Sequence, residues 1–105
     1  MDKFMGLKLQ GRLMDAEEMF SMSPFPFENN AYQGENSSTF VNELRRNCDV
    51  YLDYMEDEGC SDSLILVVKA NKLHEVFEEV VRSHPDDIIH GDVTPLGTAY
   101  YLWWD

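Results

Sequence analysis

Five consecutive apolar residues, Leu64 to Val68, constrain the fold more than any other feature of this sequence. Successive side chains of a strand point to opposite faces, so a run without polar residues places apolar side chains on both faces. Turn-forming residues, Ser61 to Ser63, precede the run. We therefore predict a strand here that is central in its sheet or covered on both sides.

The C-terminal stretch, Thr98 to Asp105, is also predicted to be a strand, because it is rich in aromatic and other β-forming residues. Alternate side chains of this strand would share a face: Ala99, Tyr101 and Trp103 on one, and Tyr100, Leu102 and Trp104 on the other. One face must belong to the core, and the other can be exposed. A shorter strand is predicted within Asp86 to Asp92, before a turn at Thr94 to Gly97.

Two segments show the apolar spacing of amphipathic helices. The longer prediction covers Thr39 to Glu58, in which an apolar face lies opposite an acidic one. Its apolar positions are Phe40, Val41, Leu44, Cys48, Tyr51, Leu52 and Met55, and its acidic positions are Asp49, Asp53, Glu56 and Asp57. The other helix is predicted to start at the cap Asn71 and to end at His84-Pro85. Its inner stripe comprises Leu73, Val76, Phe77, Val80 and Val81.

The N-terminal third combines a strand, a short helix and a long loop. Alternating leucines predict a strand from about Phe4 to Leu13. Asp15 and Glu18 have the spacing of a capping box for a helix that continues to about Met22, where two prolines follow. Residues 23–38 have loop composition, but they contain three aromatic residues, which predict that the loop packs onto the domain. A loop that faces a partner is the alternative. The three rings are Phe25, Phe27 and Tyr32.

This order of elements predicts a single α+β domain over residues 1–105. A chain of this length builds one hydrophobic core. We predict a small mixed β-sheet of three to four strands with two main helices packed on one face. A right-handed crossover after the strand at Leu64 would make the last strands its parallel neighbours.

The charge of the chain argues against several function classes. The sequence has 20 acidic residues against 8 Lys and Arg, which gives a formal net charge of −12. Nucleic-acid ligands require a basic patch, and no basic cluster is visible in the sequence, so we expect no nucleic-acid partner. No apolar run approaches the roughly 20 residues of a membrane span, and the N-terminus lacks a secretory apolar segment. We expect a cytoplasmic protein without a membrane partner.

The sequence offers little support for catalysis. Cys48 lies on the apolar face of the longest predicted helix, and Cys60 follows a run of acids, which disfavours a thiolate. Motifs for hydroxyl nucleophiles and for phosphate-binding loops are absent from the sequence. The acids between Asp53 and Asp62 lie on a predicted helix, whereas calcium loops of the EF-hand type lie between helices. We therefore predict no enzyme, no cofactor and no metal.

Carboxylates crowd the C-terminal end of the longest predicted helix, where the helix dipole is negative. Each one would destabilise the helix by about 0.3–1 kcal/mol, so their presence points to use in binding. An acidic ridge beside aromatic rings would complement a basic protein, with charge giving fast association and rings giving tightness. The predicted partner-binding residues are Asp49, Asp53, Tyr54, Glu56, Asp57, Glu58, Asp62, Tyr100, Trp103 and Trp104.

The predicted function is to bind and neutralise a basic protein, such as a toxin nuclease or another nucleic-acid effector. In size, charge and composition the chain resembles immunity proteins, antitoxins and phage-borne inhibitors. One alternative is a small metal-dependent enzyme or module centred on His84, His90 and Asp92. Another is a subunit of a larger assembly or homo-oligomer that pairs through the aromatic terminal strand. In the simplest alternative, the rings are core and the acids only keep the protein soluble.

Overall fold

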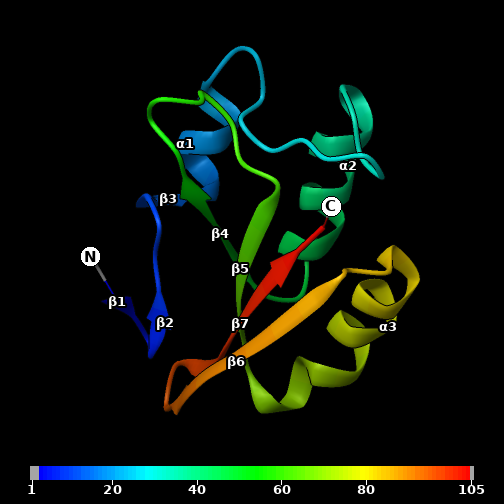
Figure 1. Cartoon of the computed structure of the whole chain (residues 1–105). Helices are drawn as coiled ribbons and strands as arrows, with labels where there is room; N and C mark the ends of the chain where they lie inside the picture. Colours follow the sequence, from blue (N-terminus) through cyan, green and yellow to red (C-terminus); the bar gives the residue numbers. More distant parts are fainter. Residues whose placement is uncertain (1–2, 105) are drawn as a thin grey trace.

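Residues 3–104, the part of the chain that the computed structural model describes, form a five-stranded sheet with helices on one face and a β-hairpin on the other (Figure 1). This arrangement confirms the predicted α+β class. The elements in chain order are β1 (Lys3–Phe4), β2 (Leu7–Lys8), β3 (Arg12–Asp15), α1 (Ala16–Ser21), α2 (Glu35–Arg45), β4 (Asp49–Tyr54), β5 (Ser63–Val68), the 3₁₀ turn η1 (Ala70–Lys72), α3 (Leu73–Ser83), β6 (Asp87–Thr94) and β7 (Gly97–Trp103).

The main sheet has the strand order β3-β4-β5-β7-β6, and each neighbouring pair is antiparallel. The prediction of a mixed sheet with three to four strands is therefore wrong. α3 carries the chain from β5 across to β6, so these two strands run parallel without being neighbours. The tight turn between Thr94 and Gly97 then returns β7 to the position between β5 and β6. There the residues from Thr98 to Trp103 pair with the whole of β5.

β5 lies in the middle of the sheet, as its apolar run predicts, and all six of its residues are buried. Leu64, Leu66 and Val68 face the core beneath the helices. Ile65 faces the other side, where the β1–β2 hairpin and the residues after it bring Leu7 and Leu9 against the sheet. Coverage on both sides is the physical reason that the run from Leu64 to Val68 contains no polar residue.

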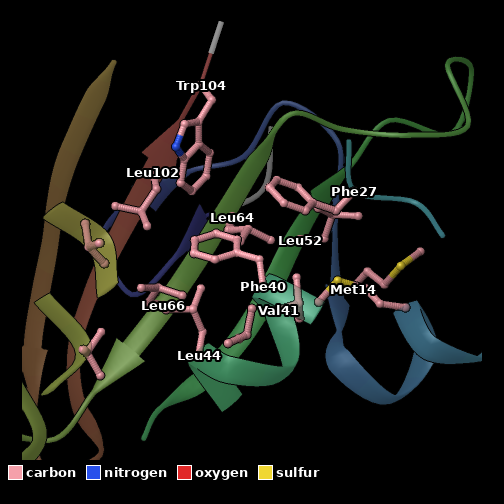
Figure 2. Packing of buried hydrophobic residues seen from close by; sticks show 14 of the residues in the cluster. Met14, Phe27, Phe40, Val41, Leu44, Leu52, Leu64, Leu66, Leu102 and Trp104 are labelled. Carbon is pink, nitrogen blue, oxygen red and sulfur yellow. The ribbon is translucent and has the colours of Figure 1, made fainter. Parts of the chain in front are cut away.

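The core on the helix side joins side chains that are far apart in the sequence (Figure 2). Phe27 is fully buried, and its ring centroid lies 6.4 Å from that of Phe40 and 5.7 Å from that of Trp104. Tyr32 stacks on Phe40 with centroids 4.1 Å apart. These contacts confirm that the segment 23–38 packs onto the domain, although α2 already begins inside it at Glu35.

The predicted helix from Thr39 to Glu58 is wrong in its second half. α2 ends at Arg45, and the chain becomes strand β4 from Asp49 to Tyr54. Both strand alternation and helical spacing suit the apolar positions of this segment, so periodicity alone did not separate the two structures. β3 and β5 decide the outcome, because they supply backbone hydrogen bonds on both sides of β4.

Other local predictions have mixed outcomes. Asp15 caps α1 as expected, since its side chain accepts a hydrogen bond from the Glu18 N–H at 2.9 Å. The predicted strand from Phe4 to Leu13 is instead divided into β1, β2 and β3. α3 has no side-chain cap at its start, and Val81, predicted to face inward, is 67% exposed. None of the helices in residues 3–104 has the length and apolar character needed to cross a bilayer.

Candidate functional site

Asp53, predicted to be a docking carboxylate, is an internal structural group. Its side chain in β4 is fully buried. One carboxylate oxygen accepts from the Gly11 N–H at 2.7 Å, and the other accepts from the Gln10 N–H at 3.0 Å and the Tyr101 hydroxyl at 2.7 Å. Such donors compensate for the loss of hydration on burial. Asp53 therefore holds the segment between β2 and β3 on the sheet and is not accessible to a partner.

Two of the predicted aromatic anchors are buried as well. Trp104 is 2% exposed, and its indole N–H donates to a backbone carbonyl at the end of α3 over 3.0 Å. Tyr54 is 6% exposed, and Tyr100 is half-buried against a phenylalanine of α3 with ring centroids 4.8 Å apart. Of the predicted anchors, Trp103 keeps a substantial exposed fraction, 39%.

The other predicted carboxylates divide between the two ends of β4. Asp49 is exposed at the start of the strand, roughly 17 Å from its last residue at the usual rise per residue. Glu56, Asp57 and Glu58 are exposed in the connection between β4 and β5. The residues predicted as one helical ridge therefore do not form one surface.

Arg12, at the start of β3, neutralises one of these carboxylates. Its guanidinium forms ion pairs with both Glu18 and Glu56. The hydrogen bond from Arg12 lowers the pKa of the Glu18 carboxyl. All three side chains are substantially exposed to water, so the two pairs contribute little to stability. Their main effect is that Glu56 already has a cationic partner within the domain.

A groove lined by carboxylates lies beside Trp103, where β4 ends and β5 begins. Two adjoining hollows, of about 390 and 230 Å³, share Gln10, Met55, Asp62 and Trp103. We call them together the acidic groove. Within residues 3–104, no Lys, Arg or His lines it. The lining residues are Gln10, Glu28, Met55, Glu58, Cys60, Ser61, Asp62, Ser63, Asp87, Ile89, Tyr101 and Trp103.

Strand pairing and loop contacts bring the four carboxylates of the acidic groove together from separate segments. The backbone N–H of Glu28 donates to the carbonyl of Ser61 at 3.0 Å, which places the 23–38 segment beside the start of β5. Asp87 of β6 lies opposite Trp103 in the register with β7. The indole N–H of Trp103 donates to Asp62 Oδ2 at 3.1 Å, which fixes the polar edge of the ring.

The chemistry of the acidic groove suits an organic cation. Indole rings attract cations over their faces, and carboxylates form charge-assisted hydrogen bonds with ammonium and guanidinium groups. Metal binding has less support, because within the described residues no group of three or more His, Cys, Asp and Glu side chains is placed to hold a metal ion. His84, His90 and Asp92 therefore do not converge as the metal hypothesis requires.

The two cysteines differ in exposure. Burial, and secondarily the charge of Asp49, raises the pKa of the Cys48 thiol to about 12, and its Sγ lies 3.3 Å from the Leu44 carbonyl oxygen. A thiol of this kind stays protonated and is not an activated nucleophile. Cys60 is exposed on the wall of the acidic groove.

The aromatic terminal strand is not the edge that the assembly hypothesis requires. β7 lies between β5 and β6, so the edge strand on this side of the sheet is β6. Ile88 and Ile89 of β6 are 43% and 50% exposed. The backbone N–H of Ile88, however, already donates a hydrogen bond to the Asp87 carboxylate at 2.9 Å. Side chains that bind edge N–H groups in this way oppose pairing with another chain.

Glu28 and Asp87 are the groove carboxylates that sequence reasoning missed. Neither lies near Glu58 or Asp62 in the sequence, so no local spacing indicates that the four lie together. Comparison with known proteins adds no assignment: no family model matches the sequence, and no curated protein or solved structure is significantly similar to it.

Proposed function

We propose that this chain binds a basic protein through the acidic groove and inhibits that partner by covering the surface with which it binds an anionic ligand. The single observation that supports the proposal most is the exposed indole of Trp103, 39% accessible, in a hollow whose charged lining is entirely acidic within the described residues. This proposal keeps the partner class expected from the sequence but moves the contact from the predicted helical ridge to the groove.

A lysine or arginine side chain of the partner fits the acidic groove chemically. Its cation can lie against the Trp103 ring, a contact worth about 0.5–1 kcal/mol at exposed sites and more when water is excluded. Glu58 and Asp62 line the same hollow and offer carboxylate oxygens to its N–H groups. The apolar side chains of Met55 and Ile89 offer contact for the methylene stem.

The charge of the whole chain supports fast capture of such a partner. A net charge of −12 attracts a basic protein at long range and raises the association rate, more so at low ionic strength. A basic protein that acts on nucleic acid carries its cations where phosphates bind. Carboxylates held against those cations would exclude the nucleic acid, which is the mode of inhibition that we propose.

An oligo-arginine peptide tests the groove directly, because the exposed Trp103 reports binding through its fluorescence. The test variant removes three groove carboxylates, and a matched control removes three exposed carboxylates elsewhere, so both lose the same charge. The test variant is Glu58→Gln, Asp62→Asn, Asp87→Asn, and the control is Glu17→Gln, Glu35→Gln, Glu75→Gln.

We expect the groove variant to bind the peptide at least about tenfold more weakly and the control less than about twofold more weakly. Equal weakening of both variants would show that only net charge attracts the peptide, in which case the acids serve solubility and the proposal fails. A complementary test is inhibition: a basic nuclease that the chain inhibits should escape inhibition by the groove variant but not by the control.

A further inference from the structure

The fold gathers half of the chain's cations around one hollow, at the opposite end of β4 and β5 from the acidic groove. The hollow has a volume of about 240 Å³, and four of the 8 Lys and Arg residues line it. We call it the basic hollow. It is lined by Arg45, Arg46, Asn47, Cys48, Asp49, Val67, Lys69 and Lys72. No basic cluster is visible in the sequence, but the fold brings these four cations together.

Pairing of β4 with β5 creates the basic hollow from two distant segments. Asp49 lies opposite Val67 in the register, so the start of β4 adjoins the end of β5. Arg45 ends α2 just before β4, and Lys69 follows β5 and leads into η1. Cations separated by more than 20 residues in sequence therefore border one concavity.

Few of these cations have an acidic partner, although the Arg45 guanidinium lies over the Phe20 ring, 5.1 Å from its centroid. Arg46 lies 3.7 Å from Glu43, but within residues 3–104 no ion pair joins Arg45, Lys69 or Lys72 to a carboxylate. Among the residues that the structure describes, Asp49 supplies the only acidic side chain in the lining. The chain has 20 acidic residues that could neutralise these cations. The fold nevertheless leaves the cluster positive.

Helix dipoles explain only part of this arrangement. Arg45 and Arg46 lie at the C-terminal end of α2, where cations are favourable. Lys72, however, occupies the N-cap position of α3, where the dipole is positive and a cation is unfavourable, and no side chain caps this helix. The positive end of α3 therefore adds to the charge of Lys69 and Lys72 beside the hollow.

We infer that the basic hollow binds the phosphate group of a small ligand. Phosphate is recognised by clustered Lys and Arg side chains, and the positive end of a helix assists. At about 240 Å³, the hollow lies below the size range of pockets that enclose a whole drug-sized molecule, so it suits a phosphate group more than a large organic body. Four cations on a chain of charge −12 are too few for a nucleic-acid track.

The test is titration of the full chain with pyrophosphate and, separately, with adenosine monophosphate, followed by amide NMR at low ionic strength. We expect saturable shifts at Asn47, Cys48 and Lys69. Removing two of the cations should weaken binding at least about tenfold, and a matched loss of two cations on the β1–β2 hairpin should weaken it less than about twofold. The variants are Lys69→Gln, Lys72→Gln and, as the control, Lys3→Gln, Lys8→Gln.

Tighter binding of the nucleotide would assign the hollow to a phosphate ester, and tighter binding of pyrophosphate would assign it to inorganic phosphates. Absence of saturable shifts with both ligands, or equal weakening by the two double variants, would overturn the inference. Binding of a short oligonucleotide without binding of either small ligand would overturn it as well. The result is independent of the acidic groove, because neither double variant alters that groove.

Discussion

Replacement of Asp53 by alanine should destabilise the folded state by about 3 kcal/mol, because this carboxylate joins three donors from two distant segments. A hydrogen bond to a charged group contributes about 1.5–3 kcal/mol. The backbone N–H groups of Gln10 and Gly11 are partly reached by water and can be rehydrated, whereas the hydroxyl of Tyr101 is buried. The expected loss is therefore well below the sum of three full contributions.

Urea unfolding followed by circular dichroism at neutral pH measures this loss. A change of 3 kcal/mol corresponds to a fall in Tm of about 12 °C for a domain of this size. Asp53→Asn should lose less than the alanine variant, since the amide oxygen still accepts one N–H. Tyr101→Phe should lose about 1.5 kcal/mol, the lower end of the range for a hydrogen bond to a charged group, because it removes one of the three donors and leaves the other two in place.

Asp57→Ala is the matched control, because Asp57 is an exposed carboxylate in the same stretch of sequence. We expect its free energy of unfolding to stay within about 0.5 kcal/mol of the original value. If Asp53→Ala were equally mild, the carboxylate would not be an internal anchor, and the position would return to the set of candidate docking residues.

Two further perturbations follow from the same structure. Gly11→Ala should destabilise the domain by more than about 3 kcal/mol in urea unfolding, because a Cβ there would lie 1.9 Å from the carbonyl oxygen of Tyr54. A loss of less than about 1 kcal/mol would contradict this packing. In thiol labelling at about pH 8, exposed Cys60 should react promptly and partly buried Cys48 at least about tenfold more slowly, since burial raises the pKa of the Cys48 thiol to about 12. Equal labelling rates of the two cysteines in the folded chain would contradict the partial burial of Cys48 and the raised pKa of its thiol.

Elements with local signals could be predicted from the amino-acid sequence alone. The apolar run Leu64 to Val68 required cover on both faces, and the fold supplies it as the central strand. Asp15 and Glu18 are three residues apart and cap α1 through one short hydrogen bond. Such signals depend on neighbours along the chain, so they can be interpreted before any tertiary contact is known.

Long-range contacts select the secondary structure of the segment from Asn47 to Tyr54, where helix and strand patterns coincide. Val50, Leu52 and Tyr54 alternate as a half-buried strand requires, but the same segment also continues the apolar face of α2. Hydrogen bonds from β3 and β5, on either side, select the strand. They come from residues distant in the sequence, which is why no local pattern contains them.

The placement of charge was likewise settled only by the fold. Composition gives a net charge of −12, but it does not separate the buried carboxylate of Asp53 from the exposed one of Glu58. Antiparallel pairing of β4 with β5 puts the acidic groove at one end of these strands and the basic hollow at the other. Composition gives only the sum of the charges over the chain. A ligand responds to the charges within a Debye length of its binding site. Which charges lie that close together depends on how the backbone folds.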